Sequence, residues 1–221
     1  MRRECVVDHV FICCAEGAPE AETLVGLGLR EGSANAHPGQ GTSCKRFFFD
    51  NAYLELIWVT DARDAKGEAT RATRLWERWR YRGVEACPFG VVLSPGRDGA
   101  MSEPPFPTWS YRPSYLADNS TIEVARDTPL REPGYFYLES PSEIGLGAEP
   151  LRHEIPLTRL TSVKIEAIGA LPKSAAATAV SNLGLVEFSS GRDFLLELIF
   201  DQYRHRASAD LRPDLPLLLR W

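Results

Sequence analysis

The stretch FFFDNAYLELIW, residues 47–58, constrains the fold of this chain more than any other segment. Two runs of aromatic and aliphatic residues flank Asp50-Asn51, a pair that tolerates the positive φ of a tight turn, so the stretch predicts a β-hairpin. The second strand carries Glu55 between two leucines. Because a buried carboxylate without a partner is costly, we expect Glu55 to meet a cation, a hydrogen-bond donor or water.

The segments before the hairpin predict the order β-α-(β)-β-β. Residues 5–14, CVVDHVFICC, alternate in character and predict a strand that places His9 and Phe11 on one face. Residues 17–29 have an early proline and late glycines, which is typical of a helix. The stretch HPGQGT, 37–42, has two glycines and a proline and predicts a loop.

The last third of the chain partly repeats the first. Residues 160–167 correspond to the first strand and residues 174–185 to the first helix. FLLELIF, 194–200, corresponds to the second hairpin strand and again has a central glutamate, Glu197. Ser162 stands at the position of His9. A second copy of a β-α-β-β order indicates a duplication rather than a repeat array.

The middle of the chain predicts one helix and several strands. Residues 67–82 can place their alanines, leucine and tryptophans on one helical face, with arginines around the rest. Apolar runs predict strands over 89–95, 120–125 and 134–140. A proline-rich stretch separates the first of these strands from the second.

Composition excludes several classes of protein. The formal net charge of −5 argues against a general nucleic-acid binder, which needs an excess of cations to neutralise phosphates. No segment reaches the roughly 20 apolar residues of a membrane span. The five cysteines include no CxxC pair, so we expect reduced thiols and a cytoplasmic protein.

The motifs DHV (8–10), HPGQGT (37–42) and AYLELI (52–57) resemble those of the vicinal oxygen chelate superfamily, and within it the glyoxalase-like domain proteins. The resemblance implies an α+β fold in which βαβββ modules form curled sheets around a cavity. On this reading the chain divides into a first module (1–65), a linking helix (66–87), a middle strand-rich segment that completes the sheet (88–150) and a C-terminal partial repeat (151–221), together in one compact unit.

The same resemblance implies a divalent metal, which would be manganese, iron, nickel or zinc. His9 and Glu55 stand at the first module's ligand positions, and a third ligand would be Glu139, with Glu197 as its substitute. The residues alone leave other roles open. A strand-borne histidine and glutamate that face one cavity also suit general acid–base catalysis, and a lone histidine on an apolar strand is often a hydrogen-bonded core residue.

Two segments are candidates for contacts with a substrate. The HPGQGT loop brings His37 to the expected cavity mouth, although a purely structural loop has the same composition. The segment 106–115 combines Trp109, Tyr111, Arg112 and Tyr115 with prolines that stiffen it. Such a set suits an organic anion, and its alternative is a packed surface segment in which Arg112 forms a structural ion pair.

Three functions follow from these residues. The first is a glyoxalase-like, metal-dependent lyase, isomerase or dioxygenase that acts on a small oxygen-rich organic molecule. The second is a protein that binds or sequesters a small molecule without metal or chemistry. The third is an assembly role in which the repeated sheets form a homodimer interface. His9 and Glu55 favour the first function, and the lack of a second strand histidine favours the second.

Overall fold

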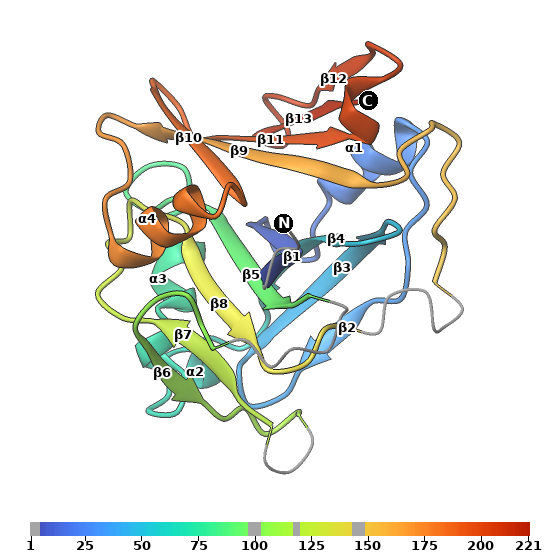
Figure 1. Ribbon diagram of the computed structural model, residues 1–221. Helices are drawn as coiled ribbons and strands as arrows, with labels where there is room; N and C mark the ends of the chain where they lie inside the picture. The colour runs from blue at the N-terminus through green and yellow to red at the C-terminus, as the bar shows by residue number, and fades with distance from the viewer. Residues whose placement is uncertain (1–4, 97–102, 117–119, 143–148) are drawn as a thin grey trace.

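Two β-sheets make up most of the computed structural model, which describes residues 5–96, 103–116, 120–142 and 149–221 (Figure 1). The larger sheet has the strand order β2-β3-β4-β1-β5-β8-β7-β6, and the smaller has the order β10-β9-β11-β13-β12. The strands of the larger sheet are β1 (Cys5–Cys13), β2 (Asn35–His37), β3 (Thr42–Phe48), β4 (Tyr53–Val59), β5 (Phe89–Pro95), β6 (Thr108–Tyr111), β7 (Ile122–Ala125) and β8 (Gly134–Leu138). Those of the smaller sheet are β9 (Leu160–Ile168), β10 (Val186–Gly191), β11 (Leu195–Phe200), β12 (Ser208–Asp210) and β13 (Leu217–Arg220).

Short helices connect the strands. They are α1 (Ala21–Gly26), α2 (Ala62–Ala65), α3 (Leu75–Arg80) and α4 (Ala175–Asn182), with 3-10 turns η1 (Arg71–Thr73) and η2 (Asp201–Tyr203). No helix among the described residues is long and apolar enough to span a bilayer. The five cysteines are buried and free.

The larger sheet has an internal symmetry about its two central strands. β1 and β5 pair antiparallel, β1 pairs parallel with β4, and β5 pairs parallel with β8. Each half then continues outward through two antiparallel pairings, β4-β3-β2 on one side and β8-β7-β6 on the other. Strands β5, β8, β7 and β6 therefore extend the same sheet that β1 to β4 begin.

The two ends of the larger sheet meet, which shows that the sheet is strongly curled. Tyr115, which follows β6, donates a hydrogen bond from its hydroxyl to Oε1 of Gln40 in the β2–β3 turn, at 3.1 Å. Ser114 donates to the carbonyl oxygen of Pro38 in the same turn, at 3.0 Å. In a flat sheet, β3 and β6 would lie roughly 29 Å apart at the usual strand spacing. The curl encloses one face of the sheet and fixes the fold class as α+β with a curled sheet.

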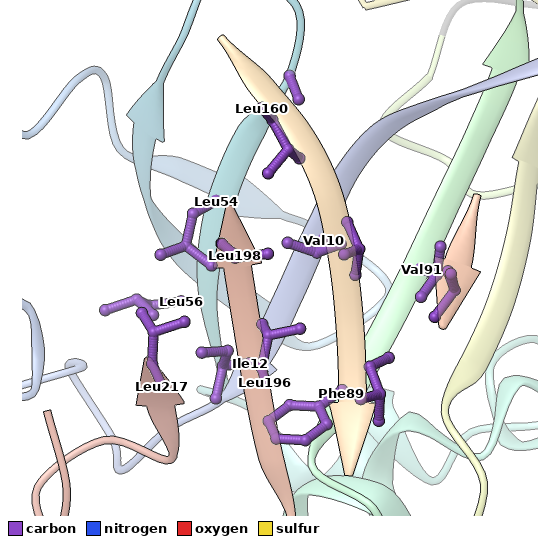
Figure 2. Packing of buried hydrophobic residues seen from close by; sticks show 14 of the residues in the cluster. Val10, Ile12, Leu54, Leu56, Phe89, Val91, Leu160, Leu196, Leu198 and Leu217 are labelled. Carbon is purple, nitrogen blue, oxygen red and sulfur yellow. The ribbon is translucent and has the colours of Figure 1, made fainter. Parts of the chain in front are cut away.

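The smaller sheet packs on the other face of the larger one (Figures 1 and 2). Figure 2 shows the alternate residues of β1, β4 and β5 meeting the leucines of β9, β11 and β13. The residues labelled there are Val10, Ile12, Leu54, Leu56, Phe89, Val91, Leu160, Leu196, Leu198 and Leu217, and all belong to one buried cluster. This face of β1 and β4 is therefore hydrophobic core, and the side chains between these positions point into the curl.

The C-terminal segment has a different topology from the first module. β4 pairs parallel with β1, whereas β11 pairs antiparallel with β9. The two similar glutamates consequently occupy different surroundings. Glu55 is 6 % exposed because β4 is covered on both faces. Glu197 lies on the outer face of β11, where Oε1 is 2.6 Å from Nε of Arg220.

Two local expectations are wrong. A single helix over residues 67–82 does not form, because Arg74 adopts φ 57° and ψ 21°, a left-handed conformation that ends a right-handed helix. At the hairpin turn, the positive-φ residues of the chain do not include Asp50 or Asn51. Asn51 instead exchanges two hydrogen bonds of 2.9 Å with the backbone of Leu160, which ties the hairpin to β9.

Candidate functional site

A cavity of about 200 Å³ lies inside the curl of the larger sheet. Its volume is below the range of roughly 300–1,000 Å³ for drug-sized ligands, so it suits a small molecule. Most of its wall is apolar or aromatic, and consists of Phe11, Tyr53, Ile57, Leu75, Val92, Tyr111, Leu116, Ile122, Phe136 and Leu138. The polar groups are His9, Asn35, His37, Gln40, Glu55, Thr73, Tyr115 and Ser142.

A β-bulge in β1 brings a buried carboxylate next to His9. Against β5, Val7 pairs with Leu93 and His9 with Val92, so Asp8 is an extra residue in β1. Its Oδ1 lies 2.7 Å from Nδ1 of His9. A carboxylate partner keeps a proton on that ring nitrogen and leaves Nε2 free to face the cavity.

Ser142 fixes Asp8 from the other half of the sheet. Its backbone N–H donates to Oδ2 of Asp8 at 2.8 Å and its hydroxyl donates to Oδ1 at 2.6 Å. Burial would raise the pKa of Asp8, but the hydrogen bonds and charge of His9, together with those bonds from Ser142, hold this pKa below its ordinary value. Asp8 is therefore an ionised carboxylate that orients the His9 imidazole.

Glu55 stands on the cavity side of His9. Its Oε2 lies 3.8 Å from Nε2 of His9, too far for a direct hydrogen bond. The His9 ring also stacks on Tyr53, with ring centroids 4.1 Å apart and planes inclined by 16°. One oxygen atom placed between Nε2 and Oε2 can lie within hydrogen-bond distance of both, because two bonds of about 2.8 Å easily span that gap.

The β2–β3 turn contributes a second polar group to the cavity. Nδ1 of His37 lies 2.9 Å from Oγ1 of Thr42, and Gln40 donates to the same oxygen at 2.7 Å. The ring of Tyr115 lies 4.8 Å from that of His37. Burial lowers the pKa of His37. His37 is therefore a neutral imidazole held by the turn.

Gly41 allows the turn its compact shape. Its φ is +73°, and a Cβ there would lie 2.3 Å from the carbonyl oxygen of Asp61. The close approach lets the carbonyl oxygen of Gly41 accept hydrogen bonds from the N–H groups of Thr60 and Asp61, at 2.9 and 3.1 Å. A side chain at Gly41 would push the turn away from the strand that holds Glu55.

His37, Cys44 and Glu55 form a cluster that has the donors of a metal site. One ligand atom from each lies within 4.8 Å of the others, and all three residues are buried. Nitrogen, sulfur and oxygen donors together are typical of zinc. Burial, with the charge of Glu55 and a hydrogen bond to it, raises the pKa of the Cys44 thiol far above its ordinary value. Cys44 would therefore have to lose its proton on metal binding.

The strands on the β5 side of the larger sheet contribute apolar side chains to the cavity wall. β5 contributes Val92, and β8 contributes Phe136 and Leu138. A metal held by His9 and Glu55 would find no nitrogen, sulfur or carboxylate ligand on these two strands. The donors that fit a metal lie instead on β2, β3 and β4.

The structure brings some of the predicted site residues together and separates others. His9, His37, Glu55 and Tyr111 line the cavity. Trp109 lines a neighbouring groove, Arg112 is exposed, and neither belongs to the cavity wall. Glu139 is exposed and accepts a hydrogen bond from Thr121 at 3.0 Å. Glu197 lies on the outer face of the smaller sheet, in its ion pair with Arg220.

Sequence reasoning missed three residues of the site: Asp8, Cys44 and Ser142. Asp8 is adjacent to His9, but strict alternation assigns it to the opposite face, and only the bulge reverses this assignment. Cys44 had no chemical signal beyond that of a small core residue, whereas Tyr115, which lines the cavity, belongs to the segment 106–115 that the sequence predicts to contact a substrate. Ser142 reaches Asp8 across 134 positions of sequence, which no local pattern indicates.

The first part of the chain is similar to a known family. Residues 7–93 match the family model of the glyoxalase-like domain, which confirms the resemblance to the vicinal oxygen chelate superfamily. No curated protein matches the chain.

The solved structures that match this chain have low sequence identity and TM-scores below 0.5. A hypothetical protein from Staphylococcus aureus is 11 % identical with a TM-score of 0.49, over 98 % of this chain and 99 % of the other. A hypothetical protein from Bacillus halodurans is 12 % identical with a TM-score of 0.39, over 65 % and 99 %. A mutant of 4-hydroxymandelate synthase from Streptomyces coelicolor is 12 % identical with a TM-score of 0.42, over 90 % and 72 %.

Proposed function

We propose that the cavity binds a small organic molecule through a hydroxyl or carbonyl oxygen, and that Glu55 and His9 transfer protons on it, as in a lyase or isomerase. The observation that carries this proposal is the gap of 3.8 Å between Nε2 of His9 and Oε2 of Glu55, in a cavity whose wall is mostly apolar or aromatic. A substrate oxygen between these two atoms would contact both an acid and a base.

The proton balance is simple in this arrangement. The Glu55 carboxylate takes a proton from the carbon next to a carbonyl group, and protonated His9 donates its Nε2 proton to the carbonyl oxygen, which leaves a neutral enediol or enol. The Glu55 carboxyl group then gives its proton to the neighbouring carbon of an enediol, and neutral His9 takes the proton of the other hydroxyl group, which completes an isomerisation and restores both side chains. Asp8 stabilises the imidazolium through its hydrogen bond to Nδ1.

The lining also restricts the charge of the ligand. Among the described residues, the cavity wall contains no lysine or arginine. The guanidinium of Arg46 lies 5.9 Å from the centroid of the Tyr53 ring, but it donates to the carbonyl oxygen of Ser33 and pairs with Glu149. An organic anion would therefore meet the Glu55 carboxylate without a free guanidinium in the wall. A neutral molecule with a small oxygen-bearing end and a compact apolar body suits this wall better.

Exchange of carbon-bound hydrogen for deuterium tests the proton transfer without knowledge of the full reaction. Small α-hydroxyketones and 1,3-diketones in D₂O are followed by proton NMR with wild-type protein. We expect exchange with at least one probe, and a loss of about 100-fold or more in Glu55→Gln, because a positioned base contributes 10²–10⁴-fold. Glu197→Gln is the matched control, since the same substitution falls in a similar strand outside the cavity.

The alternative of a non-catalytic binding protein gives a different result. In that case some probe raises the melting temperature, no probe exchanges, and Glu55→Gln leaves the thermal shift largely intact. Absence of both exchange and binding for all probes would contradict a small-molecule function of this cavity.

A metal-dependent reaction is the second candidate, because His37, Cys44 and Glu55 form a cluster of suitable donors. A divalent ion bound there would polarise a substrate oxygen as a Lewis acid. The test is metal content after reconstitution with manganese, iron, nickel and zinc in turn. Reconstitution with cobalt gives a second readout, because cobalt bound to the Cys44 sulfur would show a sulfur-to-metal charge-transfer band.

The variants decide between ligand sets. If the cluster holds the metal, Cys44→Ser abolishes the charge-transfer band and His37→Gln lowers stoichiometry, whereas Glu197→Gln binds as wild type does. If His9 and Glu55 hold it, His9→Asn has the largest effect and Cys44→Ser little. Retention of metal in the three site variants, Cys44→Ser, His37→Gln and His9→Asn, would contradict both sites.

A further inference from the structure

A second groove lies beside the cavity, formed by α3, β6 and the β7–β8 connection. Its volume is about 560 Å³, and it shares Thr73 and Phe136 with the cavity wall. Its charge is opposite to that of the cavity. Three arginines line it, Arg74, Arg78 and Arg126, and among the described residues Asp127 is the one carboxylate in its wall.

Arg78 is a buried cation whose partners are carbonyl groups. The residue is 4 % exposed. Its Nη1 donates to the carbonyl oxygens of Cys87 at 2.6 Å and Glu132 at 2.8 Å. Within the described part of the chain no carboxylate forms an ion pair with it. Because guanidinium stays charged in proteins, the groove has a fixed positive charge at its base that neutral dipoles offset only in part.

Two exposed arginines add to this charge. Arg74 lies four residues before Arg78 and donates from Nη1 to the carbonyl oxygen of Thr128 at 3.4 Å. Arg126 donates from Nε to the carbonyl oxygen of Thr108 at 2.6 Å. Each uses part of its guanidinium for a backbone carbonyl and retains further N–H donors. Arg74 and Arg78 line the same groove, so their like charges repel each other, and an anion between them would be stabilising.

The groove also has an aromatic wall and an unused donor. Trp109 is half-buried there and contacts Tyr111, with ring centroids 6.1 Å apart. Tyr135, another lining residue, is 1 % exposed, and its hydroxyl has no hydrogen-bond partner among the described residues. Arginine forks beside an indole ring suit a planar organic ligand that carries a carboxylate or phosphate.

We propose that this groove is a binding site for an organic anion, in which Arg74, Arg78 and Arg126 hold a carboxylate or phosphate group and Trp109 contacts the ring that bears it. The site is separate from the acid–base cavity, whose described wall has no arginine or lysine. Trp109, which does not line the cavity, would contact the ligand in this groove.

Calorimetric titration with benzoate, inorganic phosphate and neutral benzamide at low salt tests the proposal. We expect saturable binding of benzoate and phosphate and none of benzamide. Arg74→Gln and Arg126→Gln should each raise the Kd of benzoate about tenfold, which corresponds to 1.4 kcal/mol. Both residues are exposed, so the variants are expected to fold, and circular dichroism checks this. Trp109→Ala should weaken benzoate more than phosphate.

Two controls make the result specific. Arg63→Gln removes the same charge from an exposed residue outside the groove and should change the Kd less than twofold. Glu55→Gln should bind benzoate as the wild type does, which separates this proposal from the proton-transfer function. The proposal would be overturned if benzamide binds as tightly as benzoate, or if binding does not saturate by about 10 mM anion. It would also be overturned if Arg63→Gln weakens benzoate binding as much as Arg126→Gln does, or if Glu55→Gln weakens it.

Discussion

Nδ1 of His9 lies 2.7 Å from Oδ1 of Asp8, although the two residues are neighbours in one strand. Side chains of adjacent strand residues normally point to opposite faces. The bulge in β1 removes this separation, because two residues of the bulged strand oppose one residue of β5. The extra residue therefore places the Asp8 carboxylate beside His9, where it orients the imidazole ring.

Asp8→Asn should lower stability at pH 7 by about 1–3 kcal/mol, since His9 and Ser142 lose a charged acceptor. The folded-state pKa of Asp8 lies below its ordinary value of 3.8, so its contribution is present above pH 3.8 and is lost as the pH falls through the folded value. Urea unfolding between neutral and acidic pH should show the variant approaching wild type in acid. Glu16→Gln, an exposed control, should unfold as wild type does, and a constant difference across the pH range would contradict the prediction.

His37 should titrate below 6.5, its ordinary value, because burial disfavours the imidazolium. Stability from the neutral ring is then complete above pH 6.5 and is lost as the pH falls through the folded-state pKa. Long-range nitrogen–proton NMR spectra measure each histidine directly, and His37→Gln assigns the signal. A midpoint at or above 6.5 would show that the ring is better solvated or better paired with Glu55 than its burial indicates.

Gly90→Ala should destabilise the protein by roughly 1–3 kcal/mol or more, as overpacking of a core does. A Cβ at this position in β5 would lie 2.1 Å from two atoms of the Phe11 ring, which lines the cavity. Thermal and urea unfolding measure the effect. Gly26→Ala is the control, because nothing lies within 4 Å of its added Cβ at the end of α1. Similar stabilities of the two variants would refute the close packing of Phe11 on β5.

Leu54→Ala should cost about 2–5 kcal/mol, because Leu54 is fully buried between the two sheets. The exposed Leu171 gives the comparison, since Leu171→Ala should change stability by no more than about 0.5 kcal/mol. Chemical denaturation of both variants decides the matter. A cost below about 1 kcal/mol for Leu54→Ala would mean that the smaller sheet does not pack closely on the larger.

Much of the fold followed from local patterns. Alternation in residues 5–14 and 52–60 predicts strands with His9 and Glu55 on the same side as Phe11 and Ile57, and these four residues line the cavity. The motifs around them also carried the resemblance that the match over residues 7–93 confirms. Strand periodicity is a property of the backbone itself, so neighbouring residues suffice to assign a face.

The tertiary structure decided what those faces meet. Glu55 and Glu197 lie in nearly identical sequence segments. However, β4 is covered on both faces, whereas Glu197 lies on the outer face of β11 and forms an ion pair with Arg220. Asp8 reaches His9 through a bulge, and Ser142 reaches Asp8 from 134 positions away. The sequence by itself determined the main strands and the faces on which His9 and Glu55 lie, because these depend on local geometry. Which residues meet across the cavity depends on strand order and curl, and those are set by pairings between distant segments.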